Sequence, residues 1–155
     1  FIANGQTNII PDQASMHGIL RTFDEEWRYR ARDIIRNMAE GMAASMGASC
    51  EVFIDPGYPA LVNDPDITTK ASAWAAEYLG SSMVEPLPQR MTAEDFSYYA
   101  LERPSCFYRL GVRNEEKGIL SNLHTPTFDI DEESLVTGAG LMAWIAVNSL
   151  RDLSL

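Results

Sequence analysis

The spacing of hydrophobic positions along the chain predicts four helices with strand-like segments between them. In the helical segments, apolar residues recur every three or four positions, whereas they alternate with polar residues in the strand-like segments. The helices are expected within residues 22–47, 64–80, 92–101 and 131–150. The strands are expected at residues 1–3, 13–22, 50–54 and 106–110. The pattern therefore indicates a protein that mixes helices and strands.

Three of the predicted helices have start signals in the sequence. Thr22 with Glu25 fits a capping box, in which Thr22 is the N-cap and Glu25 bonds back to it. Asp64 followed by Pro65 is an N-cap with proline in the first turn. The acidic run 131–133 places negative charge at the positive end of the last helix. These signals locate the helix starts more firmly than hydrophobicity alone.

Two helices have unusual surfaces. The first has an apolar stripe, which we expect to pack in a core, with a partner surface as the alternative. The stripe consists of Trp27, Ala31, Ile34, Ile35, Met38, Met42 and Met46. The last helix contains Gly138 and Gly140, each of which costs about 1 kcal/mol relative to alanine inside a helix. Glycines at these positions indicate close packing, which we expect to be against a sheet.

The order of elements before residue 63 is strand, strand, helix, strand. This order matches most of a split βαββαβ sandwich that lacks its first strand and first helix. The chain begins with Phe1, in the middle of a strand-like pattern. We therefore expect a piece of a longer protein, with a processed or incompletely recorded terminus as an equal alternative. A domain boundary is expected near Asn63.

Composition and charge exclude several classes of protein. The 155 residues are 46% hydrophobic and 22% charged, and no apolar run approaches the ~20 residues of a membrane span. The net charge of −10 argues against nucleic-acid binding, which needs a basic surface. Cys50 and Cys106 lie in strand-like segments, and we expect them to be buried, reduced thiols. Reduced thiols favour a cytoplasmic location.

His124 is the first candidate for chemistry. It is one of two histidines and lies in a polar loop ahead of the last helix, where a neutral imidazole can bind a metal ion. One histidine is not a zinc site, since zinc takes about four ligands, so a loop histidine bonded to backbone is the alternative. His17, the other histidine, is expected on a strand surface.

Two further pairs are candidates for a binding site. Asn8 lies beside a predicted hairpin bend, and Arg21 near the end of the returning strand could bond a carboxylate through two N–H groups. A turn asparagine and a surface arginine are the alternative. Glu94 and Asp95 form a carboxylate pair at a helix start, where one could cap the helix while the other lines a site. Capping and charge complementarity alone are the alternative.

Six motifs in order resemble the C-terminal half of the M20 family of metallopeptidases and amidohydrolases. They occupy residues 5–12, 18–24, 58–59, 91–97, 110–111 and 123–129. The nearest branch resembles hippurate hydrolases, auxin–amino-acid conjugate hydrolases and N-acetyl-diaminopimelate deacetylases. The resemblance implies an α/β protein with an α+β part. Residues 1–63 would be part of a ferredoxin-like lid or dimerisation domain, and residues 64–155 the last part of a three-layer α/β/α catalytic domain.

The resemblance also implies roles for particular residues. His124 matches a metal ligand of a centre with two divalent ions, usually zinc or manganese. Asn8 and Arg21 match the lid residues that hold a substrate carboxylate, and Glu94 with Asp95 would support the site wall. The family's other metal ligands and its general-base glutamate have no counterpart in these residues.

The expected function is hydrolysis of the amide bond of N-acyl amino acids or a related small substrate. By this interpretation the intact protein is a metal-dependent amidohydrolase, a homodimer through its lid, whereas the 155 residues alone are inactive. The alternative is a non-enzymatic dimerisation or small-ligand-binding module.

Overall fold

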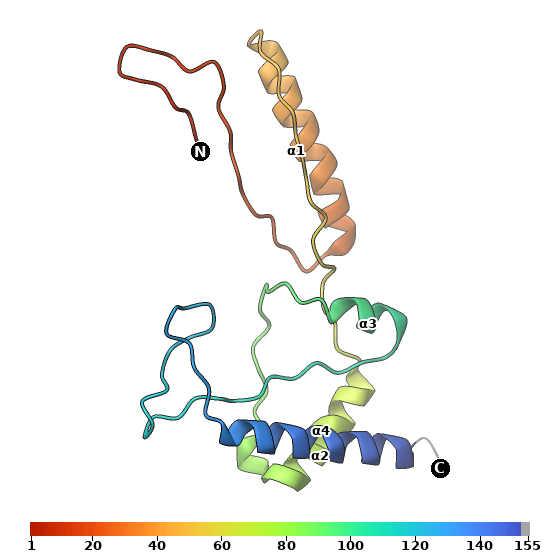
Figure 1. Cartoon of the computed structure of the whole chain (residues 1–155). Coiled ribbons are helices and arrows are strands. Elements are labelled where there is room, and N and C mark those ends of the chain that lie inside the picture. The colour runs from red at the N-terminus through yellow and green to blue at the C-terminus, as the bar shows by residue number, and fades with distance from the viewer. Residues whose placement is uncertain (153–155) are drawn as a thin grey trace. The chain divides into compact units, whose positions relative to one another are not determined.

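The computed structural model describes residues 1–152, which form two compact units (Figure 1). Unit 1 consists of Phe1–Ala60 together with Arg90–Ala93. Unit 2 consists of Leu61–Gln89 and the chain from Glu94 onward. The assignment of residues 1–63 to a lid domain and of residues 64–155 to a catalytic domain stays a prediction.

Unit 1 is organised around α1 (Glu25–Ser45). The N-cap of α1 is Asp24, whose carboxylate accepts a hydrogen bond from the Trp27 N–H at 2.9 Å. The prediction that Thr22 is the N-cap was therefore wrong. The Thr22 hydroxyl instead accepts from the Asp24 N–H at 3.1 Å and forms the turn before the helix. A carboxylate is the stronger acceptor at the positive end of a helix, which explains why Asp24 takes the cap.

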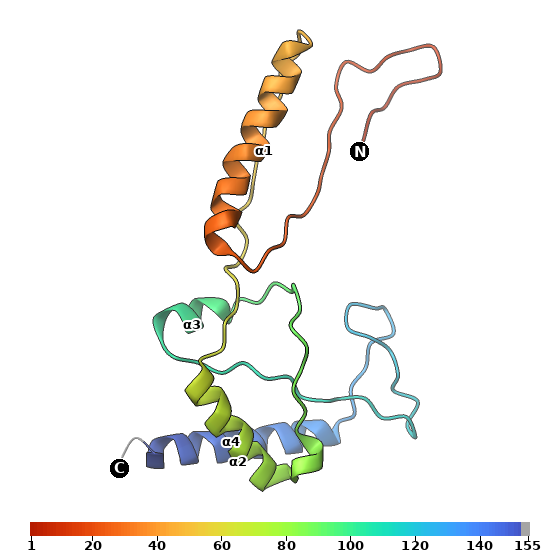
Figure 2. The same ribbon diagram turned by 180° about the vertical axis from the view of Figure 1, so that it is seen from behind.

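The chain that follows α1 returns along the helix (Figures 1 and 2). Arg28 and Arg32 both donate to the Pro56 carbonyl, and the Glu25 carboxylate accepts from the Ala60 N–H at 2.7 Å. Partial burial raises the pKa of Glu25, but its hydrogen bonds from Arg28 and Ala60 and the charges of both arginines outweigh this effect and lower the pKa below 4.5. These contacts attach the return segment to the first turns of α1.

The segments of unit 1 that were predicted as strands form only isolated bridges. Ile2 forms an isolated antiparallel bridge with Ser15, and Gln6 forms one with Ile9. No bridge extends into a ladder within residues 1–152, so the strands predicted at 1–3, 13–22 and 50–54 were wrong. A strand needs a neighbour that satisfies its backbone groups along its length, whereas segments 1–3 and 13–22 share a single bridge and segment 50–54 has none. The ferredoxin-like arrangement is accordingly not seen in unit 1.

The apolar stripe of α1 lies at the surface. Trp27, Met38 and Met46 are 46%, 62% and 80% exposed, whereas Ala31 is buried. The expectation of core packing was therefore wrong for this structure, because no sheet forms in unit 1 to cover the helix. Cys50, expected to be buried, is exposed for the same reason. Large apolar side chains such as tryptophan and methionine are normally covered in a folded domain.

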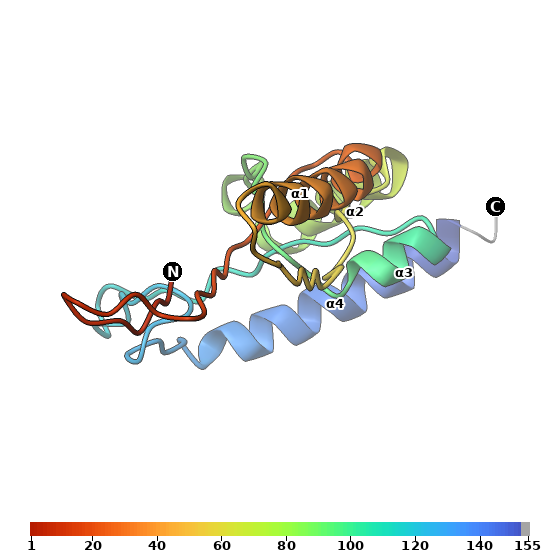
Figure 3. The same cartoon turned by 90° about the horizontal axis from the view of Figure 1, so that it is seen from above.

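Four helical elements lie in the part of unit 2 that the structure describes, up to residue 152. Their bounds are Pro65–Leu79 for α2, Ser81–Met83 for the short 3-10 helix η1, Ser97–Glu102 for α3 and Glu133–Asp152 for α4. The Asp64 carboxylate accepts from the Ile67 N–H at 2.9 Å, which confirms the predicted cap of α2. Figure 3 shows α4 as a long, straight helix. No helix within residues 1–152 is both long and apolar enough to cross a membrane.

The core of unit 2 lies where α2 packs on α4. Ala71 and Ala75 of α2 and Leu141 of α4 are buried. The rings of Tyr78 and Trp144 stack across this contact, with their centroids 6.3 Å apart. Small side chains on α2 let the two helices approach, and the aromatic pair fills the end of the contact.

Gly138 and Gly140 provide the close packing expected of them, but not against a sheet. A Cβ atom at Gly138 would lie 2.7 Å from the Leu110 side chain, and one at Gly140 would overlap the Tyr78 hydroxyl. Leu110 belongs to an extended segment and Tyr78 belongs to α2. The glycines of α4 therefore admit a leucine and a tyrosine side chain.

Replacing Gly140 by alanine is expected to destabilise unit 2. The added Cβ would displace the Tyr78 ring from its stack on Trp144, which costs up to about 3 kcal/mol and outweighs the helix preference of about 1 kcal/mol that alanine supplies. Gly41→Ala in α1 is the matched control, because nothing lies within 4 Å of an added Cβ there, and it should stabilise. Urea unfolding of the two variants measures both effects. A Gly140→Ala variant that is stabilised as much as Gly41→Ala would contradict the packing.

The predicted strand at residues 106–110 is extended but has no strand partner among the residues described. Its backbone bonds to a side chain instead. The Asn63 amide donates to the Phe107 carbonyl and accepts from the Phe107 N–H, both at 2.9 Å, and the Asp64 N–H donates to the Ser105 carbonyl at 2.9 Å. An amide side chain offers one donor and one acceptor, as a neighbouring strand would. The free Cys106 is half-buried in this segment.

Candidate functional site

His124 lies in a turn of unit 2 whose backbone is constrained. Its φ of 64° is left-handed, a conformation that residues other than glycine adopt uncommonly. The Ser121 and Thr127 hydroxyls bond each other at 2.8 Å, and the Thr125 hydroxyl donates to the Asn122 carbonyl at 2.8 Å. The imidazole is exposed and takes no part in the hydrogen bonds found among residues 1–152. The backbone-bonded alternative for this histidine therefore has no support.

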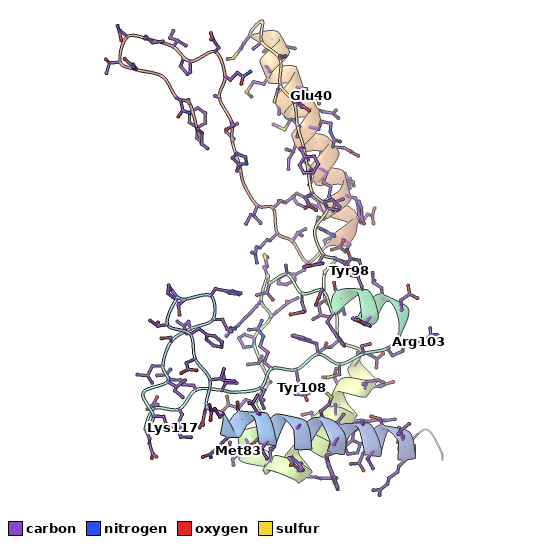
Figure 4. All side chains as sticks on the ribbon, viewed as in Figure 1. Glu40, Met83, Tyr98, Arg103, Tyr108 and Lys117 are labelled. Atoms are coloured by element: carbon purple, nitrogen blue, oxygen red, sulfur yellow. The ribbon has the colours of Figure 1, made fainter. Side chains whose placement is uncertain are left out.

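The chain on either side of the His124 turn meets at a polar cluster. The Asp131 carboxylate accepts from the Asn114 amide at 2.6 Å and from the Lys117 ammonium at 2.6 Å. The hydrogen bond from Asn114, followed in size by the one from Lys117, lowers the pKa of Asp131 to about 2. The carboxylate is therefore ionised at neutral pH. Figure 4 labels Lys117 beside the start of α4. We call Asn114, Lys117 and Asp131 the loop clamp.

The loop clamp is not evident from the sequence pattern. Residues 112–121 have the composition of an exposed polar segment, and Asp131 has the position of a charge at the start of a helix. The sequence signal that could have indicated it is Gly118, because a glycine is typical of a tight turn. In the structure Gly118 has a φ of 72°, and the Lys117 N–H donates to the Asn114 side chain within this turn. A tight turn at residues 114–119 places Asn114 and Lys117 together, but their contact with Asp131 is long-range.

Asn8 and Arg21 lie at different places in unit 1. Asn8 is exposed in a tight turn closed by two hydrogen bonds of 3.1 Å between Gln6 and Ile9. Arg21 is exposed and donates to the Met91 carbonyl at 2.5 Å. The turn lies at the tip of the N-terminal hairpin, whereas the chain runs on from the hairpin to the start of α1 (Figure 1). The structure does not bring the two side chains together, and their joint role stays a prediction.

Glu94 and Asp95 precede α3 in unit 2. The helix was expected from residue 92 but begins at Ser97, which is fully buried and donates to the Glu94 carbonyl from both its N–H and its hydroxyl. No side chain caps α3, so the expected capping carboxylate was wrong. Glu94 is half-buried and Asp95 is exposed. Their role in a site wall stays a prediction.

Comparison with known proteins places the chain in a family. The family model for peptidase family M20/M25/M40 matches residues 5–148, which include every candidate residue named above. The chain belongs to this family. The match supports an α/β-type peptidase fold at the level of the family.

Curated relatives of this M20 chain include three kinds of hydrolase. Thermostable carboxypeptidase 1 of Saccharolobus solfataricus is 38% identical over 90% of the chain and 35% of the relative. N-acetylcysteine deacetylase of Bacillus subtilis is 37% identical over 94% and 37%. IAA-amino acid hydrolase ILR1-like 6 of Arabidopsis thaliana is 32% identical over 94% and 32%. The chain spans about a third of the length of these relatives. No solved structure matches.

M20 peptidases are generally metal-dependent, so the donors in this chain matter. Within residues 1–152, no three histidine, cysteine, aspartate or glutamate side chains lie close enough to hold a metal ion. His124 is exposed, and its imidazole is available to bind a metal ion through a ring nitrogen. These residues can therefore supply one ligand to a metal ion, but they do not by themselves form a complete metal centre. His17 is exposed in unit 1, but the strand on whose surface it was expected does not form.

Proposed function

We propose that the whole protein hydrolyses the amide bond of N-acyl amino acids or of related small, peptide-like substrates. The family match over residues 5–148 carries this proposal. It is supported by two relatives whose names describe a deacetylase of N-acetylcysteine and a hydrolase of IAA-amino acid. Both names describe substrates with an acyl group on an amino acid, which is a small amide with a free carboxylate.

In this proposal His124 is one ligand of a divalent ion in a centre of two zinc or manganese ions. Such ions, when bound, polarise an amide carbonyl and lower the pKa of a water molecule. The other ligands and the general-base glutamate are expected elsewhere in the whole protein. The exposed imidazole supports the assignment, because a histidine ligand needs one ring nitrogen with a free lone pair, and no hydrogen bond found among residues 1–152 occupies one.

Arg21 is proposed to bind the substrate carboxylate, with Asn8 as its partner. Arginine has five N–H donors in a planar arrangement, and the bond to the Met91 carbonyl uses one of them. The guanidinium is exposed, so donors remain for a two-pronged bond to a carboxylate. Fixing the guanidinium through Met91 reduces the freedom that it would lose when substrate binds.

A substrate screen tests the proposed function. The whole protein with zinc or manganese should release free amino acids from N-acyl amino acids, and a chelator should abolish the release. Amides without the carboxylate should react much more slowly, and the 155-residue chain alone should be inactive. Cleavage of unblocked peptides with no release from any N-acyl amino acid would contradict the proposal and favour a carboxypeptidase.

The proposed partner is a second copy of the protein, bound through residues 1–63. The exposed apolar stripe of α1 supports this proposal, since large apolar patches at a surface mark contacts with other chains. The molar mass of the whole protein in solution tests it, and a monomer at all concentrations would contradict it.

A further inference from the structure

The two ends of the His124 loop are held through one residue. The backbone of Asn114 pairs with Ile119, where the loop 120–130 begins, through hydrogen bonds of 3.1 and 2.8 Å. The side-chain amide of Asn114 donates at 2.6 Å to Asp131, where the loop ends. The Asp131 N–H also donates to the Val112 carbonyl at 2.9 Å. The loop therefore leaves and re-enters the fold at the same point.

Asp131 joins several segments at this point. Its carboxylate accepts from Asn114 and from Lys117, and it also accepts from the Glu133 N–H at 3.3 Å in the first turn of α4. The Asp131 side chain is 13% exposed, whereas the Lys117 side chain is 47% exposed. Hydrogen bonds to an ionised carboxylate with little access to water are stronger than neutral ones. One carboxylate thus joins residues 112–119, the loop and α4.

The loop requires such anchoring because of the conformation at its centre. His124 has a left-handed backbone, which a residue with a Cβ keeps when the surrounding chain leaves it little choice. The cross-loop bond between Ser121 and Thr127 is a contact between two exposed hydroxyls. With its ends free, a loop of this length samples many conformations. Fixing both ends restricts the directions in which the imidazole can point.

We propose that Asp131 is a positioning residue for His124, acting through Asn114 and Lys117 to fix both ends of loop 120–130. In this role Asp131 binds neither substrate nor metal. The value of the positioning for catalysis rests on the proposed function, in which His124 is a metal ligand. The effect on the loop itself does not depend on that function.

Hydrogen–deuterium exchange of the whole protein tests the proposal. In Asp131→Asn, and independently in Lys117→Met, backbone amides of residues 120–130 should exchange about tenfold faster, because a charge-assisted bond is lost. Arg113→Met is the matched control, since it removes a positive charge from the same segment, residues 112–119, but its partner is Glu115, in a well-exposed pair. Exchange in α2, and in α4 beyond its first turn, should be unchanged, since Asp131 and Lys117 contact α4 at Glu133. Unchanged exchange of residues 120–130 in both variants would overturn the proposal.

A second measurement separates this proposal from the proposed function. Metal affinity of the whole protein, measured by competition with a chelator, should fall in Asp131→Asn by about tenfold, as for residues that orient a ligand. If His124→Ala leaves the affinity unchanged, the metal-ligand assignment fails, while faster exchange in Asp131→Asn still supports positioning of the loop. If His124→Ala loses metal but Asp131→Asn changes neither exchange nor affinity, the positioning role fails and the proposed function stands.

Discussion

Replacing His124 by alanine in the whole protein is expected to lower kcat/KM for N-acyl amino acids by at least about 100-fold, because changes to residues that merely support a ligand already cost about 10–100-fold. The bound metal content should fall together with the activity. Assays of hydrolysis and metal analysis on the same preparation measure both. A variant that keeps its metal and its activity would show that His124 has no role in the centre.

His17→Ala is the matched control for this prediction. His17 is the other histidine of the chain and is exposed in unit 1. Its replacement removes the same group and is expected to leave activity and metal content within about twofold of wild type, as surface substitutions usually change little. Equal losses in the two variants would mean that the effect comes from removal of any histidine and not from a ligand at position 124.

Replacing Arg21 by alanine is expected to raise KM and to lower kcat/KM by about 10–100-fold, since it removes charged hydrogen bonds to the substrate carboxylate. Arg21→Lys should recover part of the loss, because lysine keeps the charge without the planar pair of donors. Steady-state kinetics with N-acyl amino acids and with analogues that lack the carboxylate measure the effect. The analogues should react equally well before and after the change.

Arg36→Ala provides the control for Arg21. Arg36 lies on α1 and pairs with Asp33 at 3.5 Å in an exposed contact, so its loss changes the net charge without touching the proposed site. Its kinetics are expected to match wild type. If Arg21→Ala weakens the reaction of substrates with and without a carboxylate to the same extent, Arg21 supports the structure and does not recognise the carboxylate.

Local signals predicted the helices well. Asp64 and Pro65 define the start of α2, and the glycine after it ends the helix as expected. At α1 the capping signal was displaced by two residues, from Thr22 to Asp24. Helix hydrogen bonds join residues four apart, so the information that decides them lies within the segment itself. For this reason the residue pattern alone was enough to predict α1, α2 and α4.

Strands and the surroundings of the candidate residues could not be found in the same way. The segments at residues 1–3, 13–22, 50–54 and 106–110 have strand composition but form no ladder within residues 1–152, because pairing needs a partner from elsewhere. The role of Asn63 as a substitute for such a partner was not evident either. The same limit applies to the contact of Asn114 with Asp131, whose residues are separated by the His124 loop.

The sequence by itself determined the family, the three long helices and the identity of His124, Asn8 and Arg21 as candidates, because these depend on residue type and short spacing. The tertiary structure decided which side chains meet. It placed Tyr78 against Gly140, attached Arg21 to the Met91 carbonyl and closed the His124 loop through Asp131. Each of these contacts joins positions far apart in the chain, and their energies depend on distance in space and on burial, which no local pattern specifies.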